Sequence, residues 1–155
     1  MLRFPYQTEP LTGPAPPSLP PGTLVRWRPL VPVTIVGPGG LQRDFGRAIL
    51  DDASDDTVFP LDVAVGIGVR LHPDTGHRVR WRGQLHALRF GQVELVLTDN
   101  HATWRWPAMV GFSPAPLRYP LLGQAGCLQF MDARFLGADL AAELETNHTY
   151  PGSCV

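Results

Sequence analysis

Residues 48–60 of the chain read Ala-Ile-Leu-Asp-Asp-Ala-Ser-Asp-Asp-Thr-Val-Phe-Pro. Four carboxylates stand at positions 51, 52, 55 and 56, directly after the apolar pair Ile49-Leu50, which is typical of the end of a buried strand. From the residues alone, two interpretations are open. The cluster is either a solvated acidic turn, with Asp55 or Asp56 capping a helix that begins near Pro60, or the loop of a site where carboxylates move protons.

The sequence on both sides of this cluster predicts short strands joined by turns. The 17 Pro and 16 Gly residues oppose long helices. The clearest helix signal is Pro60–Ile67, which has proline at its start and Asp62 in its first turn. We therefore expect a mostly β protein with one or two short helices. The predicted strands are Thr23–Arg28, Leu30–Val36, Phe45–Leu50, Arg78–Arg82 and Leu88–Leu97.

The chain has 155 residues, the length of one ordinary domain. Residues 10–22 are rich in proline, which favours polyproline II over helix. We expect residues 1–22 to form an extended arm lying on a domain of residues 23–148, with a C-terminal tail at 149–155. The alternative for the arm is a ligand for a proline-binding module.

Composition excludes several classes of function. The formal net charge is -1, so the chain is no polybasic nucleic-acid module. All 13 basic residues are Arg, and the absence of Lys excludes a Schiff-base nucleophile and a Walker-type phosphate site. No apolar run reaches membrane-spanning length. The N-terminal residues lack the apolar core of a secretory signal. We expect a cytoplasmic protein with no membrane partner.

The segment 49–58 resembles the active-site strand and loop of the retropepsin-like aspartic proteases, the family of retroviral proteases and their relatives. The family has two apolar residues, then Asp-Thr/Ser-Gly-Ala/Ser, often followed by Asp-Asp-Thr-Val. In this chain Asp51 falls on the catalytic aspartate. A later family landmark, two apolar residues and Gly, is matched by Leu121-Leu122-Gly123. The rest of the active-site loop is then Asp52, Ala53, Ser54, Asp55, Asp56 and Thr57.

The resemblance, which covers about residues 30 to 145, implies a fold and an activity. The fold would be a small closed β-barrel of the retropepsin type, with a helix after the active-site loop and a short one after Gly123. The strand pair within 78–97 would be the flap that closes over a peptide. The chemistry needs two carboxylates that share a proton. Because the chain supplies one such motif, the resemblance implies a homodimeric aspartic endopeptidase with Asp51 from each subunit, and no cofactor or metal. The flap tip would be Arg82, Gly83, Gln84 and Leu85.

Three positions depart from the family pattern. Asp52 replaces the Thr or Ser whose hydroxyl braces the two active-site loops, and two facing Asp52 carboxylates repel unless protonated. Ala53 adds a methyl group where the family has Gly. Gln124 stands where retroviral members often carry an Arg that pairs with the loop, which leaves Asp55 without that partner. These departures keep open the alternative of a catalytically inactive domain that binds peptide or protein.

Other candidate sites carry weaker signals. A literal Asp-Thr-Gly occurs at 74–76, but it follows Pro73, which predicts a surface turn. The five His are scattered and have no metal-ligand spacing with either Cys, and the chain has no Gly-x-Ser-x-Gly elbow. Cys127 lies among apolar residues, as a buried thiol does.

Arg and Trp alternate in three places, which is typical either of strands with Trp inward or of a single-stranded nucleic-acid surface. We favour the core interpretation. The three places are 26–28, 80–82 and 104–106.

Overall fold

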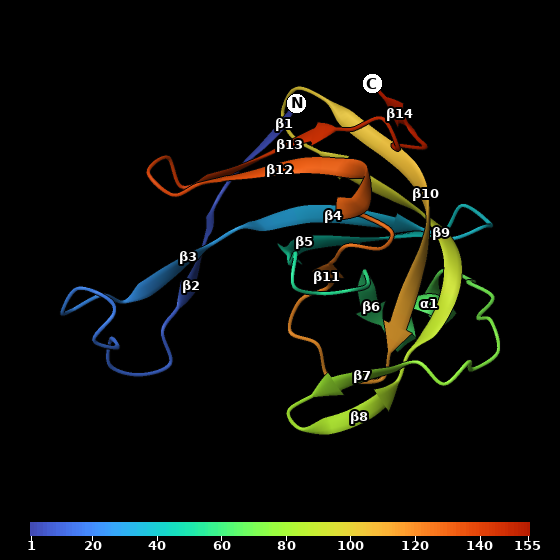
Figure 1. Cartoon of the computed structure of the whole chain (residues 1–155), viewed down its shortest axis with the longest axis horizontal. Helices are drawn as coiled ribbons and strands as arrows, with labels where there is room; N and C mark the ends of the chain where they lie inside the picture. Colours follow the sequence, from blue (N-terminus) through green and yellow to red (C-terminus); the bar gives the residue numbers. More distant parts are fainter.

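The computed structural model covers residues 1–155 and is mostly β, as predicted, with half of the residues in strands. Six strands form a closed mixed barrel in the order β10-β6-β11-β5-β4-β9, and β9 pairs with β10 to close it (Figure 1). The barrel strands are β4 (Leu30–Val36), β5 (Gln42–Leu50), β6 (Val58–Pro60), β9 (Arg89–Thr98), β10 (Thr103–Ser113) and β11 (Leu121–Leu122). The C-terminal β14 (Ser153–Cys154) adds to the edge of β10.

Alternating side chains of the barrel strands fill its interior. Trp106, Phe59 and Phe112 are fully buried there, within one continuous core of 25 residues. The indole N–H of Trp106 donates to the carbonyl oxygen of Gly126 at 2.8 Å, so the largest core side chain is also satisfied as a hydrogen-bond donor. The core interpretation is confirmed for Trp104 and Trp106. It is wrong for Trp27, which is half exposed on a separate two-stranded ribbon.

The predicted helix is present as α1 (Leu61–Gly66), with Pro60 at its N-cap and Ile67 at its C-cap. No side chain caps its first turn. The interpretation of Asp55 or Asp56 as a helix cap is therefore wrong, and the acidic loop needs another explanation. A second, 3₁₀ turn, η1 (Leu128–Phe130), follows β11. No helix of the chain has the length and apolar character needed to cross a membrane.

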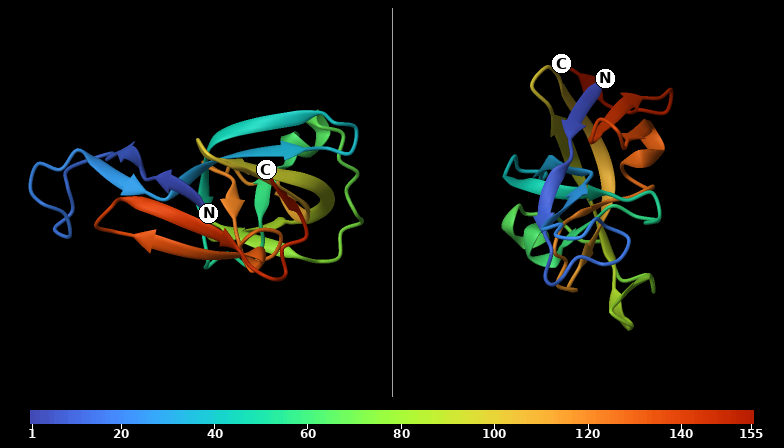
Figure 2. Two further views of the ribbon diagram at one scale, coloured as in Figure 1. Left: turned by 90° about the horizontal axis from the view of Figure 1, so that it is seen from above. Right: turned by 90° about the vertical axis from the view of Figure 1, so that its left-hand side faces the viewer.

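The N-terminal residues differ from the expected arm. Strand β1 (Leu2–Pro5) joins β13 (Ala141–Thr146) and β12 (Met131–Leu136) in a three-stranded sheet above the barrel. Strands β2 (Gln7–Pro10) and β3 (Val25–Arg28) form the two-stranded ribbon. The proline-rich segment is the loop at the ribbon's tip, and Figures 1 and 2 show it extending away from the barrel rather than lying on it. Proline there shapes a long turn between paired strands.

A hairpin extends below the barrel, as Figure 1 shows. It consists of β7 (Arg78–Trp81) and β8 (Gln84–Ala87), joined at Arg82 and Gly83. Both turn residues have positive φ, 49° and 79°, which suits the twist of a two-residue hairpin. The predicted junction near Gly83 is confirmed, but its second strand is Gln84–Ala87. The predicted strand Leu88–Leu97 corresponds to β9, which belongs to the barrel.

A polar cluster at the base of the ribbon ties it to the barrel. The Glu9 side chain is about 10% exposed, and its carboxylate accepts from Arg118 Nη1 at 2.7 Å and from the Tyr119 hydroxyl at 3.2 Å. Arg28 Nε lies 3.2 Å from the same carboxylate. Because Arg118 and Tyr119 lie in the loop that leads into β11, Glu9 connects the N-terminal ribbon to the strand beside β5.

We expect Glu9→Gln to destabilise the protein by about 1 kcal/mol, because charge-assisted hydrogen bonds are replaced by neutral ones while the partly exposed arginines leave the charges screened by solvent. The measurement is the free energy of unfolding in urea. Asp139→Asn is the matched control, since its carboxylate is well exposed and makes one long contact, with Arg3. Equal stabilities of the two variants would show that the Glu9 cluster contributes nothing.

Candidate active site

Asp51 lies at the end of β5, where a neighbouring strand holds its backbone. Strand β11 runs parallel to β5, with Leu121 beside Ile49 and Leu122 beside Leu50. The Asp51 N–H donates to the Leu122 carbonyl at 3.1 Å. The Asp51 carboxylate accepts from the Ala53 N–H at 3.1 Å, which turns the chain directly after the strand. The aspartate is thus held on a rigid strand rather than on a free loop.

The loop after Asp51 is interlocked with the segment after β11. The Gln124 N–H donates to the Ser54 carbonyl and the Ala125 N–H to the Asp55 carbonyl, both at 2.9 Å. The Thr57 N–H in turn donates to the Ala125 carbonyl at 3.0 Å. The structure therefore brings together the two segments that the sequence analysis paired, although about 70 residues separate them in the chain.

Gly123 sits where these segments cross. A Cβ atom on Gly123 would lie 2.7 Å from the carbonyl oxygen of Ser54 and closer still to that of Asp56. The buried hydroxyl of Thr57 accepts from the Gly123 N–H at 3.2 Å. Only glycine allows this approach of two backbones, which gives the third position of Leu121-Leu122-Gly123 a physical reason.

The carboxylates of the loop have no cations beside them. None of Asp51, Asp52, Asp55 and Asp56 takes part in an ion pair. The Gln124 side-chain amide donates to the Asp52 carbonyl oxygen at 3.3 Å. Asp52 and Asp55 are exposed and Asp51 is half-buried. Four carboxylates without an ion-pair partner thus lie together in this loop.

The Asp56 carboxyl is partly buried at the end of this loop. Partial burial raises the pKa of Asp56 above its usual range, and the carboxylate of Asp55 adds to the rise, whereas His77 opposes it. His77 comes from the segment before β7, and no feature of the sequence placed it near this loop. Its position brings the base of the hairpin within electrostatic range of the acidic loop.

The raised pKa makes a pH-dependent prediction for Asp56→Asn. Ionised Asp56 is less favourable in the folded protein than in the unfolded chain, so its ionisation lowers stability as the pH rises past its pKa. We expect the Asn variant to be modestly more stable than the wild type at pH 7 and equal to it below about pH 3. Urea unfolding at the two pH values measures this. A stability difference that is the same at both would show that charge is not its cause.

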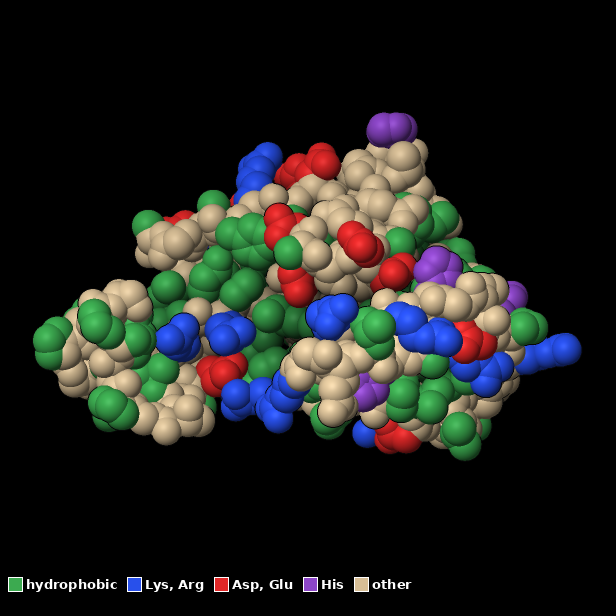
Figure 3. Space-filling model, turned by 60° about the horizontal axis from the view of Figure 1, so that its bottom comes forward, with side chains coloured by type: hydrophobic (Ala, Val, Ile, Leu, Met, Phe, Trp, Pro, Cys, Tyr) green, Lys and Arg blue, Asp and Glu red, His purple; other side chains and the backbone are tan.

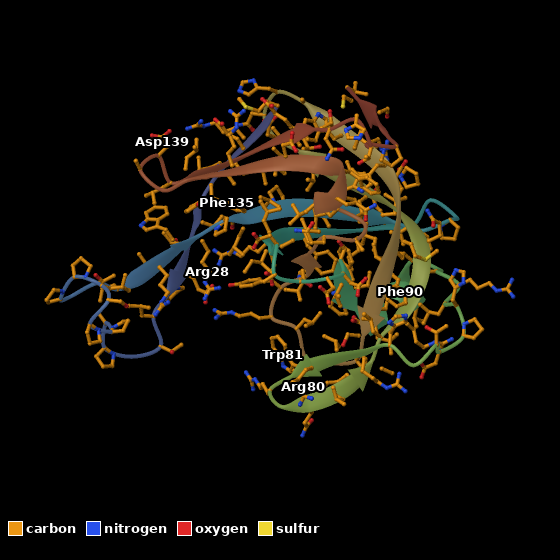
Figure 4. All side chains as sticks on the ribbon, in the orientation of Figure 1. Arg28, Arg80, Trp81, Phe90, Phe135 and Asp139 are labelled. Atoms are coloured by element: carbon orange, nitrogen blue, oxygen red, sulfur yellow. The ribbon has the colours of Figure 1, made fainter.

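The hairpin β7–β8 lies on the same side of the molecule as the acidic loop, and its tip extends beneath it (Figure 1). Leu85 at the tip is 59% exposed. Arg80 and Trp81 occupy neighbouring positions of β7 (Figure 4). The Trp81 indole N–H is buried without a hydrogen-bond partner, the only such side-chain atom in the chain. The hairpin therefore carries one exposed leucine beside its turn and an unused donor at Trp81.

Carboxylates gather on the face of the molecule that carries this loop, and they border a hollow lined by hydrophobic side chains (Figure 3). Arginines lie on the other side of the carboxylates in the same view. Asp51 lines none of the five principal surface pockets. A single copy thus presents Asp51 on an open face rather than in an enclosed cleft.

The other candidate residues lie apart from this face. Asp74 lies in the loop between α1 and β7, where hydrogen bonds from Arg78 and from the Gly76 N–H lower the pKa of its carboxyl. The expected surface turn is confirmed there.

Cys127 is buried, and burial raises the pKa of its thiol to about 12, which confirms the expected buried thiol. Cys154 is exposed and unpaired. No cluster of three His, Cys, Asp or Glu side chains is placed to hold a metal ion.

No known protein family, curated protein or solved structure matches the chain. The chain is a mostly β protein with a closed six-strand mixed barrel.

Proposed function

We propose that the protein is a homodimeric aspartic endopeptidase of the retropepsin type, with Asp51 as its catalytic carboxylate. The observation that carries the proposal is the interlocked pair of segments around Asp51, in which the acidic loop and residues 123–125 exchange backbone hydrogen bonds. Retropepsin-like proteins share the order of these motifs, with a flap hairpin between them. In this chain the hairpin β7–β8 lies between the two motifs in sequence order, which supports the proposal.

The proposed chemistry needs a second carboxylate close to the first. One carboxylate takes a proton from water, and the other donates a proton to the scissile carbonyl, so the pair must share one proton. Asp51 has no carboxylate of its own chain in that role, since Asp52 follows it on an exposed turn. A second copy, related by a two-fold axis beside Asp51, would supply the partner. The hydrophobic hollow and the hairpin tip would then hold a peptide substrate.

The concentration dependence of activity tests this proposal. Peptide hydrolysis per chain is expected to rise with protein concentration and to level off where sedimentation shows the chain to be dimeric, because a monomer carries half of the site. Activity per chain that stays constant from the monomeric to the dimeric range would contradict the two-copy site.

The positions of Asp52 and Ala53 support a second candidate function, a domain of the same fold that binds peptide without cleaving it. Asp52 is exposed and takes part in no ion pair. About the proposed axis, two Asp52 carboxylates would face each other and oppose the approach of the two copies. A chain with this repulsion can retain its fold after losing catalysis.

The variant Asp52→Thr separates the two candidates. In the peptidase, removal of the facing charges is expected to tighten the dimer by on the order of tenfold at pH 7 and to raise activity at low protein concentration. Sedimentation and peptide hydrolysis measure the two effects. A tighter dimer without hydrolysis would favour the binding domain, and unchanged association would show that Asp52 does not face its copy. Asp62→Thr, on the outer face of α1, is the control for net charge.

A further inference from the structure

Strand β12 is an unpaired edge whose two faces are both open. It pairs with β13 on one side only and forms the outer edge of the three-stranded sheet, as Figure 2 shows from above. Residues 132–135 are all exposed, whereas four of the six residues of β13 are buried. Phe135 is 43% exposed, and Figure 4 shows it on the hairpin that extends beyond the barrel. An exposed edge strand presents unpaired backbone N–H and carbonyl groups that can pair with another strand.

The backbone of β12 directs its free groups outward at alternate residues. The Asn147 N–H donates to the Phe130 carbonyl, and Asp132 lies opposite Glu145 in the same register. Because hydrogen-bonded pairs alternate along an antiparallel ladder, Asp132 and Arg134 bond to β13. Ala133 and Phe135 therefore present their N–H and carbonyl groups to the free edge.

The side chains of β12 are complementary to a second copy of the same strand. Antiparallel pairing about a two-fold axis at Ala133 would place Asp132 of each copy opposite Arg134 of the other. The neighbouring registers, with the axis at residue 132 or 134, would oppose two Asp or two Arg. Within its own chain Asp132 has no ion pair and lies opposite the like charge of Glu145, while Arg134 makes one loose contact at 3.9 Å. The second copy would relieve both.

We propose that two copies of the chain associate through β12, paired antiparallel with Ala133 on the two-fold axis, so that the two three-stranded sheets become one. Phe135 would then lie opposite Met131 of the other copy, and the outward N–H and carbonyl groups of Ala133 and Phe135 would be satisfied. The inference concerns the homodimer that the proposed function requires, but it rests on the strand itself and not on the chemistry of Asp51.

Charge exchange between the two positions tests the register. Asp132→Arg alone would oppose two pairs of arginines, and Arg134→Asp alone would oppose two pairs of aspartates. We expect each single variant to weaken the dimer by about tenfold or more and the double variant, Asp132→Arg with Arg134→Asp, to restore it. Sedimentation equilibrium measures the dissociation constants. Arg70→Asp, on the loop after α1, changes the net charge without touching β12.

A cysteine at the axis provides a second measurement that does not depend on charge. In a Cys154→Ser background, Ala133→Cys would place two thiols at the spacing of a disulfide, and oxidation is expected to yield a covalent dimer. Arg70→Cys in the same background, at an exposed position away from β12, is the control, and we expect it to remain monomeric after oxidation.

The outcomes separate this proposal from the proposed function. A dimer that is unaffected by all three charge variants, or a wild type that stays monomeric at high micromolar concentration, overturns the pairing through β12. A dimer that follows the charge pattern but cleaves no peptide supports the pairing and counts against the peptidase alone.

Discussion

We expect the replacement of Asp51 by Asn to abolish the proposed peptide-bond hydrolysis. The amide neither takes up nor releases the shared proton, so we expect kcat/KM to fall by on the order of 10⁴-fold, the upper range for loss of acid–base catalysis. Asn has nearly the shape of Asp, and its side-chain oxygen can still accept from the Ala53 N–H. The folded structure and its stability should therefore be retained, and circular dichroism and urea unfolding check this.

Asp74→Asn is the matched control, because Asp74 begins the only literal Asp-Thr-Gly of the chain. Its turn is exposed and held by Arg78 and Gly76, so its activity should equal that of the wild type. Loss of hydrolysis in Asp74→Asn with retention in Asp51→Asn would reverse the assignment of the catalytic aspartate.

Among substitutions that add one methyl group to the candidate site, we expect Gly123→Ala to lower the free energy of unfolding most. The new Cβ would overlap the carbonyl oxygens of Ser54 and Asp56, which are backbone atoms that cannot rotate away. We expect a loss of about 3 kcal/mol in the free energy of unfolding, at the upper end for overpacking, because the two crossing segments must separate. Activity should fall with it, since Asp51 is held by the same crossing.

Gly39→Ala is the control for Gly123→Ala. Gly39 lies in the turn between β4 and β5, and a Cβ there would meet no atom within 4 Å. Its stability should change by less than about 0.5 kcal/mol, as for other surface substitutions. Similar losses in both variants would show that the cost is general to glycine replacement and that the crossing at Gly123 has no special role.

Local patterns predicted much of the barrel. β4 begins and ends at the residues that its β-branched run predicts, and α1 begins after the proline that marks its start. Both signals depend on neighbours in the chain, such as proline geometry and side-chain alternation. The short strand Gln84–Ala87 was missed although its polar and apolar residues alternate, because Gly83 interrupts the pattern. Its pairing with β7 depends on the turn at Arg82-Gly83.

Contacts between distant segments explain what the sequence could not predict. The ribbon β2–β3 forms because the backbone groups of Gln7–Pro10 pair with those of Val25–Arg28. The proline content of the segment predicts extended backbone but does not show which strand it pairs with. In the candidate site, Asp51 and Gly123 were found through the resemblance, which supplied a long-range pairing. No motif of the sequence predicted that His77 acts on the pKa of Asp56. This effect depends on how close the loop before β7 lies to the acidic loop.

The most direct measurement is cleavage of a pooled peptide library between about pH 3.5 and 7, with Asp51→Asn as the paired control and mass spectrometry as the readout. The proposed dyad predicts cleavage by the wild type that is absent from the variant at every pH. No cleavage at any pH by a wild type that is folded and dimeric would contradict the peptidase, as would equal cleavage by the variant.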